Sequence, residues 1–385
     1  MSPPAHVLLH EETLDPSFVP PRLPRREAEL TLLGKRYRDS LGKGVPFHLL
    51  LTGGIGSGKT ALARRLAAEL ERGGRLGPWT VRPTYINCWR RASDRTVLLD
   101  LLRSVGVSLP DRGYSLSEML DVFEQGIRRT PAHHVVVLDE AAALVKQGTK
   151  LVYLLSRGRE VGLGSISLVL VAAEDLLPFL DAASRSSFGV THRLTLEPYD
   201  RAALVDILAA RSELALRPGS YSVDLLEQIA RVAAPSGDAR FALEVLTNAA
   251  RLADDEGVAE LTAEHVRKAK GSILPTVSES HLEQLSTNQL GVLLAIARTL
   301  RGKGASVPSQ KLRRTHTSLL EELGGRPMSR TTFWRTLKEL EREGLVSLEV
   351  GASGESSQVA MDELPASLLS TLLEERLGQA GSSSR

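Results

Sequence analysis

The stretch GGIGSGKT, from Gly53 to Thr60, decides the fold of this chain. It follows the apolar run Phe47–Leu51, which has the length of a buried strand, and it precedes the Ala/Leu-rich run Ala61–Arg72, which has the pattern of a helix. A strand, a glycine-rich loop and a helix in this order predict a phosphate-binding loop at the edge of an α/β sheet.

Each residue type in the pattern G-x-x-x-x-G-K-T has its own task. Gly56 and Gly58 let backbone N–H groups turn toward an anion, and the positive end of the following helix favours negative charge. Lys59 is expected to reach the β- and γ-phosphates of ATP, and Thr60 to offer its hydroxyl to Mg²⁺. The residues expected to contact the nucleotide here are Gly54, Ile55, Gly56, Ser57, Gly58, Lys59, Thr60 and Ala61.

A second apolar run, HVVVLDE from His134 to Glu140, ends in two carboxylates. Beside a phosphate-binding loop, Asp139 is expected to hold Mg²⁺ and Glu140 to activate the attacking water. A strand that ends in Asp-Glu is often purely structural, so this interpretation depends on the presence of Gly53–Thr60.

Length and composition indicate a globular protein of several domains. A chain of 385 residues is too long for one ordinary domain, and we expect three. Cys88 is the only cysteine, so no disulfide forms within the chain, and Met1–His10 does not read as a secretory leader. No apolar run approaches the roughly 18 residues that span a bilayer. We expect a cytoplasmic protein and no membrane contact.

The pattern changes twice along the chain. Up to residue 198, strands alternate with helices, which predicts a parallel sheet with flanking helices; the further strands are expected at Thr84–Asn87, Val135–Leu138, Ser167–Val171 and Arg193–Leu196. Residues 199–274 form a predicted α-helical lid, with helices at Ala202–Arg211, Val223–Val232, Ala239–Ala253 and Thr262–Lys268.

The last part of the chain, residues 275–385, predicts a winged helix-turn-helix domain with a disordered tail after Leu377. Its expected elements are the helices Ser286–Leu300, Pro308–Leu323 and Ser329–Arg342, followed by the strands Leu345–Val350 and Gln358–Met361. Ser329 stands where the N-cap of the third helix is expected. The excess of basic residues between Arg301 and Arg335 is a candidate polyanion surface, or alternatively a solvated helix face.

These features together resemble the AAA+ replication initiators of the archaeal origin recognition complex and cell division control type. The resemblance extends from Leu14 to about Leu372 and is carried by Asp15–Pro20, Leu23–Glu27, Gly53–Thr60, Tyr85–Cys88, Val137–Glu140, Pro198-Tyr199, Gly237–Arg240 and the C-terminal module. It implies a weak ATPase that uses ATP/ADP and Mg²⁺. It also implies double-stranded origin DNA, the replicative helicase and a paralogous initiator as partners.

The resemblance assigns further site residues. The stretch Val19–Glu27, with Val19 and Arg26 as nucleotide contacts, would wall the adenine. Tyr199 with Arg211 would complete the nucleotide pocket from the lid. Arg240 would be the lid arginine that reaches the γ-phosphate. Arg185 is our choice for the finger supplied to a neighbouring subunit, against the alternative of an ordinary surface arginine.

One position departs from the family pattern. After the strand Ser167–Val171 the family usually presents an asparagine, whereas this chain has Glu174. A carboxylate near a γ-phosphate repels it. We therefore expect slow hydrolysis, or a Glu174 side chain that points away.

Two segments are candidates for DNA contact. The third helix of the winged helix would place Arg330 and Arg335 at guanine edges; Trp334 and Leu337 are expected in the core instead. The residues expected to contact phosphates are Ser329, Thr331 and Thr332, with Ser353 from a wing, Gly351–Ser357, that carries Glu355 in place of the usual arginine.

The second segment is an insertion at residues 95–129, with helices expected at Arg95–Val105 and Ser115–Arg129. It resembles the initiator-specific insertion that touches DNA in the family. Arg112 in its loop is the candidate contact, or else an ordinary exposed arginine. Two alternative functions stay open at this point, a AAA+ DNA motor of the branch-migration type and a nucleotide-gated transcription regulator. The insertion and Glu174 count against the motor.

Overall fold

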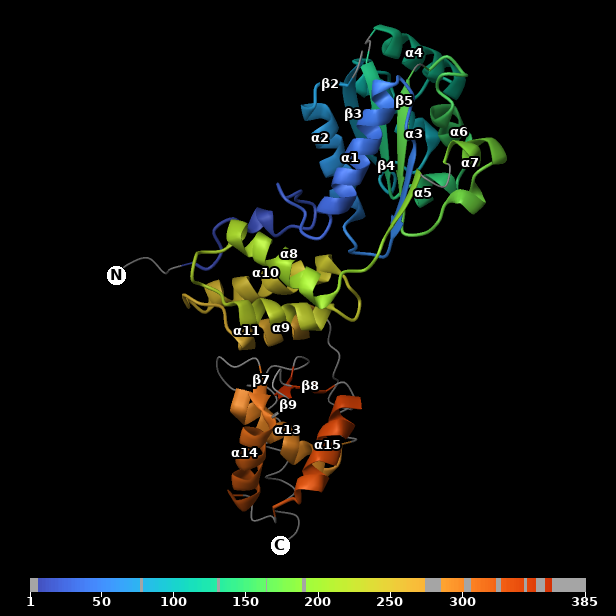
Figure 1. Cartoon of the computed structure of the whole chain (residues 1–385). Coiled ribbons are helices and arrows are strands. Elements are labelled where there is room, and N and C mark those ends of the chain that lie inside the picture. The colour runs from blue at the N-terminus through green and yellow to red at the C-terminus, as the bar shows by residue number, and fades with distance from the viewer. Residues whose placement is uncertain are drawn as a thin grey trace. The chain divides into compact units, whose positions relative to one another are not determined.

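The computed structural model describes residues 6–76, 79–129, 132–163, 165–188, 192–273, 285–300, 306–322, 327–342, 345–350 and 357–361. The chain divides into two compact units, which are described separately (Figure 1). One comprises Ser17–Ala203 with Ser236–Ala239, and the other comprises Met1–Pro16, Leu204–Pro235 and Arg240–Arg385.

The first unit is built on a six-stranded sheet in the order β2-β3-β4-β5-β1-β6. The strands are β1 (Leu49–Gly53), β2 (Arg75–Leu76), β3 (Trp79–Asn87), β4 (Ala132–Asp139), β5 (Ile166–Val171) and β6 (Arg193–Leu196). All neighbouring pairs are parallel except β2–β3. The predicted parallel α/β core is confirmed, and the short antiparallel β2 is an addition that the sequence pattern did not indicate.

Helices cover both faces of the sheet, as the alternating residues of β4 show. Val135 and Val137 pack with the core on one face, while Val136 and Leu138 pack with the core on the other. Because successive side chains of a strand point to opposite faces, a strand covered on both sides is apolar throughout. The helices of this unit are α1 (Glu27–Gly42), α2 (Lys59–Arg72), α3 (Asp94–Ser104), α4 (Leu116–Arg129), α5 (Ala142–Val145), α6 (Lys150–Ser156) and α7 (Ala182–Ser187), with a 3₁₀ turn at Leu177–Phe179.

The strand register brings the two predicted phosphate-site motifs to one edge of the sheet. β4 and β1 both pair with β5, which lies between them, and all three run in the same direction. Their carboxyl ends, Asp139 and Gly53, therefore lie at the same edge. The site at this edge follows from the topology.

The second unit contains the helices that were predicted as a lid. They are α8 (Arg201–Ala215, which begins in the first unit), α9 (Val223–Ala233), α10 (Ala239–Asp255) and α11 (Ala263–Ile273). The N-terminal segment joins them. Leu8 forms a β-bridge with Leu216, and the N–H of Val7 donates to Asp254 Oδ1 at 2.5 Å. The sequence pattern gave no signal for this pairing.

The C-terminal part has the predicted winged-helix order with one extra strand. It comprises α13 (Thr287–Leu300), β7 (Ser306–Pro308), α14 (Ser309–Glu322), α15 (Arg330–Arg342), β8 (Ser347–Val350) and β9 (Ser357–Ala360). The strands are antiparallel in the order β7-β9-β8. Ser329 caps α15, because its Oγ accepts the N–H of Thr332 at 3.1 Å. Leu337 is buried as expected, whereas Trp334 is only half-buried.

Two expectations concern residues outside the described part: most of the wing, with Ser353 and Glu355, and the tail after Leu377. Among the helices that the structure describes, none is long and apolar enough to cross a bilayer.

Three histidines are buried near the amino ends of β1, β4 and β5, opposite the phosphate edge. His133 binds Ser165 Oγ and Ser167 Oγ through its two ring nitrogens, each at 2.7 Å. His48 Nδ1 accepts the N–H of Leu168 at 3.1 Å. Burial lowers the pKa of His133 to about 3 and the pKa values of His48 and His134 to about 4.

These depressed pKa values predict a loss of stability in mild acid. The unfolded chain binds protons at these histidines from about pH 6.5 downward, while the folded chain excludes them until the pH approaches 4. The free energy of unfolding should therefore fall between pH 6.5 and 4, by up to about 1.4 kcal/mol per histidine and pH unit. Urea unfolding followed from pH 7.5 to 5.0 measures this slope.

The variant His133→Gln should flatten the slope, and His10→Gln, at an exposed position, is the control for the loss of an imidazole. A urea midpoint that does not change between pH 7 and 5 would contradict the explanation.

Candidate nucleotide-binding site

The loop between β1 and α2 has the shape of an anion cradle that only glycine permits. Gly56 and Gly58 have φ angles of 71° and 90°, in the left-handed region. A Cβ on Gly58 would lie 2.4 Å from the Tyr199 hydroxyl, and a Cβ on Gly56 would lie 1.8 Å from Asp238 Oδ1. α2 begins at Lys59, so the N–H groups of its first turn lie beside this loop without helical partners.

The residues of the loop differ in how deeply they are buried and in the hydrogen bonds that they form. Lys59 is only 7 % exposed, and its Nζ donates to the carbonyl oxygens of Gly53 at 2.9 Å and Gly54 at 2.7 Å. Ser57 Oγ is buried and has no hydrogen-bond partner in the described part of the chain. Gly54 and Ile55 are exposed, and Ala61 is half-buried. The ammonium group and an unsatisfied hydroxyl fit a phosphate-binding loop.

Asp139 joins the two motifs. Its Oδ2 accepts hydrogen bonds from Thr60 Oγ1 at 2.8 Å and from the Tyr85 hydroxyl at 2.5 Å. Its Oδ1 accepts the N–H of Glu140 at 3.0 Å. The two predicted magnesium ligands, Thr60 and Asp139, are therefore in direct contact, and their oxygens are a donor set that suits Mg²⁺.

Tyr85 is a site residue to which the sequence assigned no role. Burial and the hydrogen bond to Asp139 raise the pKa of Tyr85 to about 12, so the hydroxyl stays protonated and donates. The Arg64 guanidinium lies 4.1 Å from the centre of the Tyr85 ring. The tyrosine had a signal only as part of the motif Tyr85–Cys88.

Glu140, the predicted water-activating residue, has a φ angle of 53°. A non-glycine residue in this region is uncommon and is often found at functional sites. Directly after the neighbouring strand β3, the N–H of Cys88 donates to the carbonyl oxygen of Asp139 at 2.7 Å. Burial raises the pKa of the Cys88 thiol to about 12, so this group is not a nucleophile at neutral pH.

Arg26 is buried behind the phosphate loop. Its guanidinium donates to the carbonyl oxygen of Ser57 at 3.0 Å and to that of Glu197 at 2.6 Å, and it lies 4.3 Å from the centre of the Tyr199 ring. The side chain thus supports the loop through its backbone. Val19, the other residue assigned to the adenine pocket, is half-buried.

The motif Gly237–Arg240 begins against the loop. The N–H of Ala239 donates to the carbonyl oxygen of Gly56 at 3.3 Å, and the N–H of Tyr199 donates to that of Gly237 at 3.2 Å. Arg240 follows as an exposed residue of α10. In the second unit, Arg211 is buried and donates to the carbonyl oxygen of Asp15 at 3.0 Å, and burial lowers its pKa to about 10.

Glu174, the departure from the family pattern, is paired with a cation. Its Oε1 lies 2.6 Å from Lys146 Nζ, and both side chains are about half exposed. Lys146 Nζ also lies 5.7 Å from the centre of the Phe179 ring. The carboxylate charge is thus compensated locally. Arg185, the predicted trans finger, is exposed on α7.

The predicted DNA-contacting side chains that the structure describes lie at the surface. Arg112 is exposed in the loop between α3 and α4, and Arg95 supports this loop by donating to the carbonyl oxygens of Asp111 and Tyr114, both at 2.6 Å. On α15 the exposed residues are Arg330, Thr331 and Arg335, preceded by exposed Ser329, while Thr332 is half-buried.

Known protein families match successive parts of this chain separately. Successive parts of the chain match the family models "AAA domain" at residues 46–180, "Cdc6 AAA+ ATPase-type lid domain" at 205–271 and "CDC6, C terminal winged helix domain" at 280–369. The ORC1-type DNA replication protein 1 of Aeropyrum pernix is 31 % identical over 358 residues, which cover 90 % of each chain. The chain belongs to the ORC1/Cdc6 family.

Other members support the assignment. The ORC1-type DNA replication protein 1 of Methanothermobacter thermautotrophicus is 27 % identical over 354 residues, 90 % of each chain. Among solved structures, Cdc6p from Pyrobaculum aerophilum superposes with a TM-score of 0.84 at 27 % identity, covering 97 % of this chain and 99 % of that one. The Aeropyrum pernix ORC1 protein in complex with DNA gives a TM-score of 0.64 at 28 % identity, covering 96 % and 97 %.

A substitution at Gly58 should weaken nucleotide binding by this ORC1/Cdc6 chain. In Gly58→Ala the new Cβ meets the Tyr199 hydroxyl and the backbone is forced out of the left-handed region, at a cost of about 1–3 kcal/mol. The affinity for a fluorescent ATP analogue should fall at least tenfold, and Gly58→Ala/Tyr199→Phe should recover part of it.

The matched control is Gly74→Ala, where φ is also positive, at 65°, but nothing lies within 4 Å of the added Cβ. If Gly58→Ala binds the analogue as well as Gly74→Ala does, the cradle described here is not the nucleotide site.

Proposed function

We propose that this chain is an ATP-dependent replication initiator that binds duplex origin DNA, with the bound nucleotide acting as a slow switch. The observation that carries the proposal is that one chain has two surfaces, one suited to a nucleotide and one suited to DNA. The phosphate loop, Thr60 and Asp139 form a site that fits Mg-ATP, and α15 presents exposed arginines on a winged helix.

Nucleotide binding follows from the donors around the loop. Lys59 would exchange its bonds to Gly53 and Gly54 for phosphate oxygens, and N–H groups of the first turn of α2 would add to them. Thr60 and Asp139 would hold Mg²⁺, which offsets phosphate charge when bound. Tyr85 would orient the Asp139 carboxylate. Arg240 is our candidate for the γ-phosphate.

Slow hydrolysis is expected because the Glu174 carboxylate has no hydrogen-bond donor. A carboxylate only accepts hydrogen bonds, so Glu174 cannot donate one to the γ-phosphate as an asparagine amide does. Its pairing with Lys146 removes repulsion without supplying a donor. The transition state loses one stabilising hydrogen bond, while Glu140 remains available to activate water. Such a site binds ATP long enough to act as a switch.

DNA binding is supported by the exposed residues of α15. Arginines at the start of a recognition helix can bind guanine O6 and N7 in the major groove, and hydroxyl groups at the same end can bind phosphates. Arg330 and Arg335 would take the first role and Ser329 with Thr331 the second. A relative, the Aeropyrum pernix ORC1 protein, has been solved in complex with DNA.

A second contact is proposed at the loop between α3 and α4. Arg95 fixes the backbone at Asp111 and Tyr114, so Arg112 between them is presented on an ordered loop. An arginine held in this way loses less conformational entropy when it binds a phosphate. This loop would add affinity that does not depend on sequence.

Two further roles complete the proposal. The initiator would act at the nucleoid in the cytoplasm and help recruit the replicative helicase beside a paralogous initiator. Arg185 is exposed on α7 and would reach the nucleotide of a neighbouring subunit.

The experiment is a binding titration with a genomic origin duplex from about 50 to 200 mM salt. Several phosphate contacts predict that affinity falls by about two orders of magnitude or more across this range. Arg330→Ala should lose about 1–3 kcal/mol of discrimination against a mutated site. Arg112→Ala should weaken binding to all sequences equally.

The control is Arg72→Ala, an exposed arginine on α2 outside both surfaces. The DNA-binding proposal is wrong if affinity is independent of salt and neither Arg330→Ala nor Arg112→Ala differs from Arg72→Ala.

A further inference from the structure

The loop between β3 and α3 exposes a tryptophan that belongs neither to the nucleotide site nor to the proposed duplex contacts. Trp89 is 78 % exposed, the largest exposed fraction among the large hydrophobic side chains that the structure describes. It lies directly after Cys88, whose N–H is bonded to the Asp139 carbonyl, and so stands at the same sheet edge as the nucleotide site. An indole left in water at a fixed position offers a broad apolar face to a ligand.

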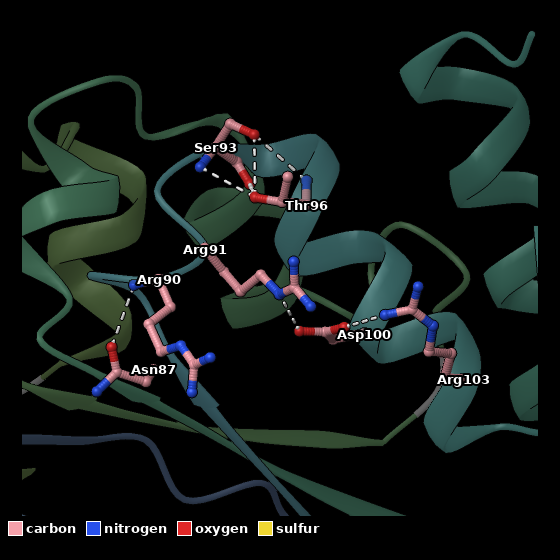
Figure 2. A network of polar contacts seen from close by, with 7 residues as sticks. All are labelled: Asn87, Arg90, Arg91, Ser93, Thr96, Asp100 and Arg103. Carbon is pink, nitrogen blue, oxygen red and sulfur yellow. Dashed lines mark hydrogen bonds and ion pairs between the residues drawn. The ribbon is translucent and has the colours of Figure 1, made fainter. Parts of the chain in front are cut away.

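The backbone on both sides of Trp89 is fixed. The N–H of Arg90 donates to Asn87 Oδ1 at 3.2 Å, and the N–H of Arg91 donates to the Asn87 carbonyl at 3.1 Å. Ser93 and Thr96 then close a capping box at the start of α3 (Figure 2). The indole is therefore presented by an ordered turn, which lowers the entropic cost of binding.

Arginines follow the tryptophan in the loop and along α3. Asp100 accepts hydrogen bonds from Arg91 Nε at 2.9 Å and from an Arg103 guanidinium nitrogen at 2.5 Å, so one carboxylate holds two guanidinium groups in place (Figure 2). Arg91 and Arg103 remain 45 % and 50 % exposed. Arg90 adds a third guanidinium, with no side-chain hydrogen bond or ion pair to another described residue. From Arg90 to Arg103 the chain carries four arginines and two aspartates, so this segment has a net positive charge.

We propose that Trp89, Arg90 and Arg91 form a binding site for single-stranded DNA. One unpaired base stacks on the Trp89 indole, and the flanking phosphates meet Arg90 and Arg91. The site requires an unpaired strand, because bases inside a duplex are stacked on one another and offer no free face. Aromatic stacking within a basic surface is the usual mode of recognition for single strands without sequence preference.

This site uses other residues than the proposed duplex contacts at Arg330 and Arg112, and it requires an unpaired strand. It would let the protein hold a strand that has separated from its complement, on the same edge of the sheet as the nucleotide. The two proposals make different demands on the DNA, so they can fail independently.

The test uses the full chain with Trp79→Phe and Trp334→Phe, which leaves Trp89 as the only tryptophan. An oligothymidylate of about 12 nucleotides, within the range of single-strand site sizes, is titrated while Trp89 fluorescence is recorded. We expect quenching that saturates. A duplex of the same length, in a parallel titration, should quench little even where it binds.

Two matched pairs of variants in the otherwise wild-type chain separate stacking from general surface effects. Trp89→Leu should weaken oligothymidylate binding by about 5- to 100-fold, while Trp89→Phe should retain most of it. Neither should change duplex affinity. Arg90→Gln should reduce the salt slope by about 0.7, and Arg72→Gln should leave it unchanged.

Absence of quenching by the single strand would overturn the proposal. So would equal affinities of Trp89→Leu and wild type for oligothymidylate, or a loss in Trp89→Leu that is as large for the duplex. If the protein binds the single strand but not the duplex, the proposed function in duplex origin binding is wrong and the single-strand site is supported.

Discussion

The carboxylate of Asp139 is the group on which the nucleotide site depends. It is 2 % exposed, and a buried charge is tolerated only where donors satisfy it. The donors are Thr60, Tyr85 and the backbone of Glu140, so a single side chain connects the ends of β4, α2 and β3. A change at any of these positions alters both the packing at the sheet edge and the oxygens that would hold Mg²⁺.

Close backbone approach is the second constraint. The absence of side chains at Gly56 and Gly58 lets Asp238 and Tyr199 lie against the loop, and Arg26 fixes the loop from behind through the Ser57 carbonyl. The segment that leads into the lid thus touches the phosphate cradle directly. A ligand that moves the loop would therefore also move Asp238 and Ala239, which lie against it.

Much of the fold could be predicted from the sequence because its signals are local. A glycine-rich loop between strand and helix, a strand ending in two acids and an N-cap serine at Ser329 each act over a few residues. The remainder depends on contacts between distant segments. No local pattern showed that Leu8 pairs with Leu216, that β7 joins the hairpin of the wing, or that Arg95 supports the loop carrying Arg112. The resemblance placed Arg26 at the adenine, yet its guanidinium binds the backbone of the loop, because a buried arginine must satisfy its donors where carbonyl groups converge.

We propose that this ORC1/Cdc6 chain binds ATP firmly and hydrolyses it slowly. A single-turnover assay with radiolabelled ATP and Mg²⁺, on wild type and Glu140→Gln, tests it most directly. We expect a wild-type rate far below the roughly 10 s⁻¹ of typical enzymes, and a Glu140→Gln variant that binds ATP equally well but does not hydrolyse it. A wild-type rate near about 10 s⁻¹, or undiminished hydrolysis in Glu140→Gln, would contradict it.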